Sequence, residues 1–183
     1  KKDIEQGHIC LAFPGVEQDD EDLYPISVMN NLFGGGMSSR LFPRIREEMG
    51  AAYSVYSFPS TYTNCGTFTV YAGTSPETAQ QVADELLGQI RLLRDGGVTQ
   101  EEFDMAKEQL KVSYVLGLES SSARMSAIGR SKLLRGHAVD PQDVIRKIEA
   151  VTKEDVERVA HRMFGRPFSA SAVGRNIDGL KLL

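Results

Sequence analysis

The feature that most constrains the fold is a pair of adjacent strand-like segments joined by a short turn. Residues 52–59 and 67–72 are both rich in β-forming side chains. Between them, residues 62–66 (Tyr-Thr-Asn-Cys-Gly) have the composition of a turn, so the three segments together predict a β-hairpin. Strands joined this closely run antiparallel, and the chain therefore needs a sheet that is at least partly antiparallel.

Strand patterns also occur near both ends of the sequence. Ile9, Leu11 and Phe13 alternate with smaller or polar residues until Pro14-Gly15 interrupts the pattern. Residues 168–174 alternate in the same way and predict a closing strand. These segments supply two further strands for the sheet.

Most of the other apolar residues recur at helical spacing. The acidic stretch 17–22 is expected to form the first turn of a helix that ends at Gly34, and Ser38 or Ser39 to cap a second helix that runs through Glu48. Five more helices are expected to begin at Ser75 (followed by Pro76 and Glu77), Thr99, Ser120, Asp140 and Thr152. The order of elements predicts an α+β fold, in which helices pack on one face of a largely antiparallel sheet, and residues 1–183 are expected to form a single domain.

Composition excludes several classes of protein. The 183 residues are 41% hydrophobic, which excludes wholesale disorder, and no apolar run approaches the roughly 18 residues of a membrane span. The formal net charge of −4 argues against a nucleic-acid surface. Because the chain begins Lys-Lys-Asp, with neither an initiating Met nor a signal peptide, we expect it to be a fragment of a longer protein.

Two cysteines, Cys10 and Cys65, are too few for a disulfide framework. Buried free thiols are expected, and a disulfide across adjacent strands is the alternative.

A metal centre within this chain is not expected. Its three histidines lie far apart, and neither His-Glu-x-x-His nor His-x-x-Glu-His occurs. Glu157 and His161 lie one helical turn apart, but that spacing is typical of a surface charge pair.

Two features could carry chemistry. Gly34, Gly35 and Gly36 precede a helix, but the Gly-Lys-Ser/Thr ending of a phosphate loop is absent, so they indicate either a simple connector or a loop that another backbone approaches closely. Arg46 is expected in the last turn of the helix and Tyr53 at the start of the next strand. Their guanidinium and phenol groups could both donate to one oxygen atom, although arginine is also common at helix ends and tyrosine in strands.

Residues 34–58 closely resemble a stretch of the pitrilysin/insulinase-type zinc peptidases, in the C-terminal half of the bacterial enzymes similar to mitochondrial processing peptidase. A glycine loop, Ser-Arg-Leu-Phe, Arg-Glu and Gly-Ala-Ala-Tyr follow one another in the family's order. The resemblance extends over roughly Glu5 to Gly174. Ala51 stands where leucine is common, and Pro43 interrupts the helix that carries Arg46.

This resemblance implies a two-half enzyme that encloses a chamber. The N-terminal half, on the same chain or on a partner subunit, would hold zinc, whereas this half would have no cofactor of its own and would be inactive alone. Arg46 and Tyr53 would act on a peptide substrate near the metal, and Gly34, Gly35, Gly36 and Ser38 would bind the substrate or contact the other half.

The alternative is a non-catalytic partner or scaffold subunit of a processing-peptidase-like complex. The intact Arg46/Tyr53 pair favours the enzyme. A homo-oligomer is compatible with either function. We expect a cytoplasmic bacterial protein, with a periplasmic one left open because the chain is expected to lack the native N-terminus.

Overall fold

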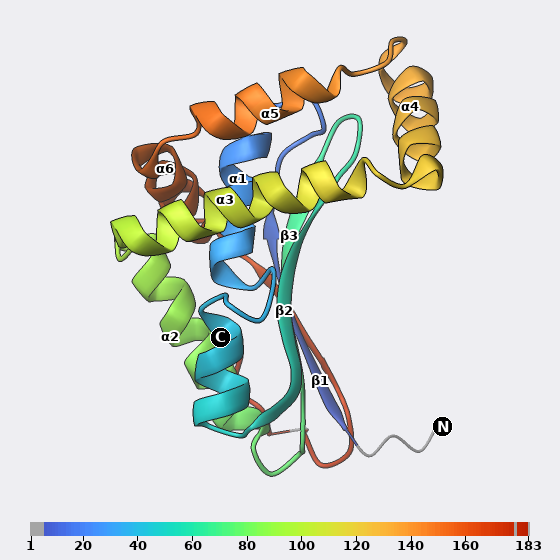
Figure 1. Cartoon of the computed structure of the whole chain (residues 1–183). Coiled ribbons are helices and arrows are strands. Elements are labelled where there is room, and N and C mark those ends of the chain that lie inside the picture. The colour runs from blue at the N-terminus through green and yellow to red at the C-terminus, as the bar shows by residue number, and fades with distance from the viewer. Residues whose placement is uncertain (1–5, 178, 183) are drawn as a thin grey trace.

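The predicted strands form one antiparallel sheet (Figure 1). The computed structural model describes residues 6–177 and 179–182. Its four strands, in the order β2-β3-β1-β4, are β1 (Gly7–Pro14), β2 (Ala52–Thr61), β3 (Gly66–Thr74) and β4 (Ser169–Val173). The hairpin is confirmed, because β2 and β3 pair from Thr61 opposite Gly66 to Ala52 opposite Thr74.

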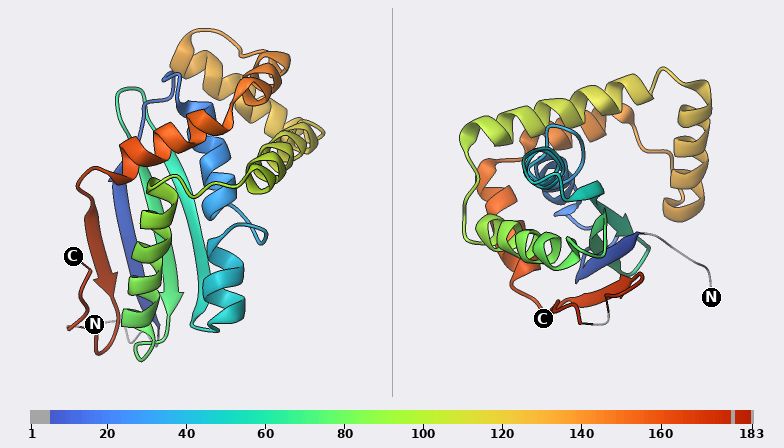
Figure 2. Two further views of the ribbon diagram at one scale, coloured as in Figure 1. Left: turned by 90° about the vertical axis from the view of Figure 1, so that its left-hand side faces the viewer. Right: turned by 90° about the horizontal axis from the view of Figure 1, so that it is seen from below.

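Helices cover one face of this sheet (Figure 2). In chain order they are α1 (Leu23–Phe33), η1 (Phe42–Glu48), α2 (Ala79–Arg94), α3 (Gln100–Gly117), α4 (Ser121–Arg135), α5 (Pro141–Ala150) and α6 (Lys153–Phe164). The predicted α+β architecture is therefore confirmed.

The core lies between the sheet and the helices. Alternate residues of β1 (Ile9, Leu11 and Phe13) are buried against the helices, while His8 and Cys10 point to the other face. Phe164, from the end of α6, packs against buried rings of β1, α1 and β3, with centroids 4.9 to 5.7 Å apart. Elements from both halves of the sequence thus meet in one core.

Most helix starts agree with the capping residues predicted from the sequence. Thr99 with Glu102 and Thr152 with Asp155 form capping boxes, and Ser120 and Asp140 accept hydrogen bonds from backbone N–H groups of α4 and α5. These contacts satisfy N–H groups that have no partner within the helix.

Three predicted helix starts are wrong. The acidic stretch 17–22 precedes α1 instead of forming its first turn, because Asp22 turns inward, where its buried carboxylate pairs with Arg158 and Arg162 of α6 at 2.7 Å. In addition, α2 begins at Ala79 after Thr78, so Ser75, Pro76 and Glu77 lie in the preceding turn. Finally, neither Ser38 nor Ser39 caps the second helix, which follows Leu41.

Both cysteines are free, but they are not both buried. Cys65 is exposed in the hairpin turn and Cys10 is half-buried on the outer face of the sheet. Burial raises the pKa of the Cys10 thiol, which disfavours the reactive thiolate. Among the described residues, no helix combines the length and the apolar character needed to cross a bilayer.

Candidate functional site

The glycine-rich loop (residues 34–39) leaves α1 and lies against β2. Gly34 donates its N–H to the Asn30 carbonyl (2.9 Å), and its own carbonyl accepts the Ser57 N–H (3.0 Å). A Cβ atom on Gly34 would stand 2.6 Å from the Ser57 nitrogen, so this position requires glycine for close approach of two backbones. None of Gly34, Gly35 and Gly36 has a left-handed φ.

Farther along the loop, the steric constraint persists at Gly35 and disappears at Gly36. A Cβ atom on Gly35 would stand 2.8 Å from the Asn31 Cα, whereas one on Gly36 would meet nothing within 4 Å. Gly35, Gly36 and Met37 are exposed to solvent. The loop is therefore anchored at Gly34 and open at Gly36.

Ser38 is the predicted site residue that contacts α3. Its hydroxyl accepts a hydrogen bond from Gln109 of α3 (3.3 Å), and it lines a cavity of about 470 Å³ between the loop and α3. Ser39, beside it, is buried and donates to the Gly36 carbonyl (2.5 Å). Ser38 thus contacts α3, whereas the Tyr53 side chain of β2 is exposed to solvent.

An ion pair fixes the end of this loop. The Arg40 guanidinium binds the Glu102 carboxylate through two contacts of 2.6 and 2.7 Å and also donates to the Gly97 carbonyl. Glu102 belongs to the capping box with Thr99, so the loop is tied to the start of α3. Burial raises the pKa of Glu102, but the hydrogen bonds from Arg40 and Thr99 outweigh it and lower the pKa to about 2.

We expect the stabilisation by Glu102 to depend on pH. Glu102→Gln should lower the free energy of unfolding by about 1–2 kcal/mol at neutral pH. The folded-state pKa of about 2 lies below the ordinary value of 4.5, so this stabilisation is present above 4.5 and is lost as the pH falls toward 2. Urea unfolding of both proteins should therefore show a difference that shrinks below about pH 4.5. Glu101→Gln, one residue earlier in the first turn of α3, is the matched control, and a difference for Glu102→Gln that stays constant down to about pH 2.5 would contradict the assignment.

The segment that carries Arg46 is a π-helix. In η1 the Met49 N–H bonds to the Arg44 carbonyl (3.2 Å), five residues earlier, and Arg46 lies in the last turn as predicted. The Arg46 side chain is exposed, with its guanidinium 4.8 Å from the centroid of the Phe42 ring. Wide helical turns of this kind are frequent at functional sites.

Tyr53 occupies an irregularity at the start of β2. Ala52 pairs with Thr74 and Ser54 with Gly73, so the register leaves Tyr53 as the extra residue of a β-bulge. Its side chain is 61% exposed. A bulge changes the direction of a side chain, and here it directs a phenol to the surface.

The connection between the two residues is well fixed. Gly50 adopts the left-handed φ of +59°, and the Ala51 carbonyl accepts hydrogen bonds from Thr74 (2.5 Å) and Thr78 (3.1 Å). Arg46 and Tyr53 are therefore two exposed donors on adjoining elements. We call this corner of η1 and β2 the Arg46/Tyr53 corner.

An aromatic row continues from this corner across the uncovered face of the sheet. Tyr56 and Phe58 of β2 are partly exposed, with ring centroids 5.9 Å apart, and Tyr71 of β3 stacks 4.8 Å from Tyr56. His8 Nδ1 and the Tyr71 hydroxyl share a hydrogen bond of 2.7 Å. Large apolar faces with polar edges suit contact with an extended peptide.

The described residues contain no group of three or more histidine, cysteine, aspartate or glutamate side chains that could hold a metal ion. Glu157 does not pair with His161 as expected. It binds Lys153 instead (2.6 Å), and His161 Nδ1 contacts the Arg94 carbonyl (3.3 Å).

Comparison with known proteins shows which family this chain resembles. The family model described as "Peptidase M16 inactive domain" matches residues 1–110. The uncharacterized zinc protease YmxG of Bacillus subtilis is 39% identical over 94% of this chain, and the uncharacterized zinc protease SCO5738 of Streptomyces coelicolor is 41% identical over 93%. The chain spans 42% and 37% of these two relatives, less than half of each.

Solved structures agree on the fold. A protease from Helicobacter pylori superposes over 95% of this chain and 42% of its own, with a TM-score of 0.85 and 20% sequence identity. The match to a peptidase M16 inactive domain from Pseudomonas fluorescens covers 94% of this chain and 42% of that protein's chain, with a TM-score of 0.82 and 24% sequence identity.

Proposed function

Since this chain belongs to the peptidase M16 family, as its inactive domain, we propose that it is the substrate-orienting half of a two-half zinc peptidase. The observation that carries the proposal is the Arg46/Tyr53 corner, where two exposed donors stand at the start of an aromatic row. The relatives are called zinc proteases and this chain spans less than half of each, which supports placing zinc in the other half, where it would activate water for attack on a peptide bond.

The role of this chain is to bind and polarise the substrate. Arg46 and Tyr53 donate hydrogen bonds to the carbonyl oxygen of the bond to be cleaved and stabilise the negative charge that develops there. The planar guanidinium and the phenol suit this role because neither has another charged partner among the described side chains. The open part of the loop, at Gly36, gives a substrate backbone room to pass.

Hydrolysis of an unfolded, fluorogenic peptide tests the proposal. The protein that carries both this chain and a zinc-bearing half should cleave the peptide, and a chelator should abolish the cleavage, whereas this chain alone should be inactive. Cleavage by this chain alone would contradict the assigned role. A protein with an intact zinc motif that cleaves no peptide would favour the partner or scaffold function.

The loop can be tested in the same assay. Gly36→Val places a side chain in open space, so the fold should survive. If the loop binds substrate, the turnover of the enzyme should fall. Gly88→Val in α2 is the control, because the new side chain also meets open space. Gly96→Val is unsuitable because Gly96 has a positive φ. Equal activity of the Gly36 and Gly88 variants would make the loop a connector.

A further inference from the structure

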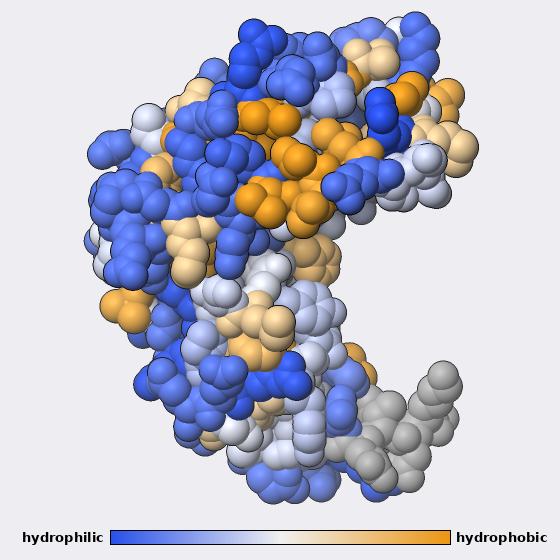
Figure 3. Space-filling view, viewed as in Figure 1, coloured by the Kyte–Doolittle hydropathy of each residue, from blue (hydrophilic) through white to orange (hydrophobic). Residues whose placement is uncertain are grey.

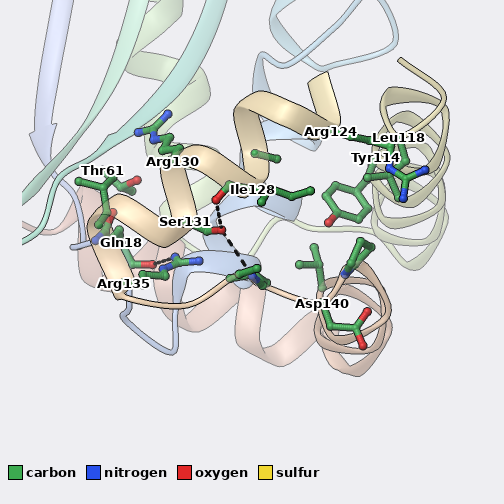
Figure 4. Close-up of a pocket in the computed structure, with 16 residues that line it drawn as sticks. Gln18, Thr61, Tyr114, Leu118, Arg124, Ile128, Arg130, Ser131, Arg135 and Asp140 are labelled. Carbon is green, nitrogen blue, oxygen red and sulfur yellow. Dashed lines mark hydrogen bonds between the residues drawn. The ribbon is translucent and has the colours of Figure 1, made fainter. Parts of the chain in front are cut away.

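Helix α4 lies apart from the other helices. Figures 1 and 2 show that α3 passes the β2 edge of the sheet and that α4 then stands beyond it, on the side of the uncovered face. A cavity of about 660 Å³ separates α4 from α3 and α5, and it is lined on their side by Tyr114, Leu118 and Val144 (Figure 4). Helix α4 therefore does not pack tightly on the helices next to it in the sequence.

None of the 15 residues of α4 is buried. The helix is joined to the body of the domain at its C-terminal end, where Arg135 binds the Asp19 carboxylate (2.6 Å) and the Gln18 carbonyl (2.7 Å). A helix of this length is only marginally stable in water unless tertiary packing buries an apolar face. The part of the chain that the structure describes does not supply this packing for α4.

The side of α4 that faces away from the cavity is uncharged. Ser122, Met125, Ser126, Gly129 and Leu133 do not line the cavity, and at 3.6 residues per turn they fall within an arc of roughly 100°. Met125 and Leu133 are 67% and 85% exposed, and a Cβ atom on Gly129 would meet nothing within 4 Å. We call these five residues the outer face of α4.

The outer face of α4 has features of a protein contact surface. The centres of protein interfaces are depleted of charged residues and enriched in methionine. Further apolar side chains gather over the neighbouring helix α3 (Figure 3), and Val112, Val115 and Leu116 of its C-terminal half are 44% to 57% exposed. An apolar surface that extends over two helices is typical of a site where another protein segment binds.

The length of the relatives indicates which segment is available to cover this surface. This chain spans less than half of YmxG and of SCO5738, so more than half of each relative is polypeptide outside the matched region. A segment joined to this chain is held near α4 at an effective concentration far above that of a second copy in solution. The remainder of the same polypeptide is therefore favoured over self-association.

We propose that the outer face of α4 is the surface on which the zinc-bearing half of the same polypeptide docks. Met125 and Leu133 become buried in that contact, and Gly129 lets the partner approach the helix closely. A half that docks there lies on the side of the uncovered sheet face, and so it faces the aromatic row that continues from the Arg46/Tyr53 corner. That the docking half carries zinc rests on the proposed function, but the contact between α4 and the rest of the protein does not.

Hydrogen exchange of the α4 backbone amides tests this contact without hydrolysis. In this chain alone, α4 should exchange rapidly, because a helix without buried residues opens locally at little cost. In the full-length protein that carries this chain, the same amides should exchange roughly 100-fold more slowly. The amides of β1, which pairs with strands on both sides, should be protected in both proteins and so report that the domain is folded.

Two matched pairs of variants of the full-length protein test whether the contact lies on the outer face. Leu133→Glu should return the exchange of α4 most of the way to that of the free chain, whereas Leu92→Glu, at a 57% exposed position of α2, should not. Gly129→Trp should have the same effect as Leu133→Glu because it blocks close approach of the partner. Gly88→Trp in α2 is its control, since a Cβ atom there also meets nothing within 4 Å.

Three outcomes would overturn the proposal. The first is equal exchange of α4 in the free chain and in the full-length protein. The second is slow exchange in this chain alone that depends on its concentration, which would assign the outer face to a second copy. The third is protection of α4 that survives both Leu133→Glu and Gly129→Trp, which would place the contact elsewhere on the helix.

These outcomes are distinguishable from those of the hydrolysis assay. Protection of α4 in a full-length protein that cleaves no peptide would keep the docking surface and reject the proposed function. Cleavage by a full-length protein whose α4 exchanges as it does in the free chain would support the proposed function and overturn the docking surface.

Discussion

Replacing Tyr53 by phenylalanine in the proposed two-half enzyme is expected to lower kcat roughly 10²–10³-fold, which corresponds to about 2.7–4 kcal/mol, the cost of removing one donor to a developing oxyanion. The change removes a single hydroxyl from a side chain that is 61% exposed, so thermal unfolding should be nearly unchanged. The measurements are kcat, KM and the melting temperature of each protein.

Two further variants make this test specific. Tyr56→Phe is the matched control, because it removes the same hydroxyl from the same strand at another exposed position. Arg46→Lys keeps the charge but loses the planar fork, and it should also reduce kcat strongly. If both residues act on one charge, the double variant is impaired less than the two separate losses combined. A wild-type kcat for Tyr53→Phe would contradict the proposed role of the Arg46/Tyr53 corner in stabilising the oxyanion.

The largest effect on stability is expected for Phe164→Ala. This buried ring packs on Phe13, Phe33 and Phe68, and truncating a buried phenylalanine typically costs about 3–5 kcal/mol. Urea unfolding would measure the loss. Phe58→Ala, on the uncovered face of the sheet, is the control and should cost less than about 1 kcal/mol. Equal losses would mean that the core is not centred on α6.

The core extends beyond the residues that the family model matches. The matched family model ends at residue 110, yet Phe164 lies beyond it and fills the centre of the core. Arg158 and Arg162, from the same helix, neutralise the buried carboxylate of Asp22. A chain cut at residue 110 should therefore leave the sheet face uncovered and fail to fold cooperatively.

The sequence predicted the local features well because they depend on neighbouring residues. The hairpin turn, the two capping boxes and the alternation of β1 need no knowledge of the rest of the chain. The predictions failed where a distant partner decides the conformation. Asp22 leaves the first turn of α1 for two arginines of α6, and β2 takes its bulge at Tyr53 while paired with β3.

The candidate site also combines features that the sequence predicts with features that depend on distant contacts. Arg46 at the end of a helix and Tyr53 at the start of a strand were predictable from spacing and from the family resemblance. The Arg40–Glu102 clamp was not, since it joins residues far apart in sequence. The placement of α4 was not predictable either, because a helix without buried residues leaves no hydrophobic pattern that indicates where it packs.

The strand order has a consequence for biosynthesis. In the finished sheet β1 lies between β3 and β4, and His8 pairs with Val173. A ribosome that adds roughly 5–20 residues per second needs on the order of ten seconds or more to travel from one of these partners to the other. During that time β1 can pair with β3 while its second edge stays open, as a site where another nascent strand could add. Holdase chaperones that cover this edge, and slow clearance of chains stalled before β4, should then matter more for the yield of this protein than its final stability.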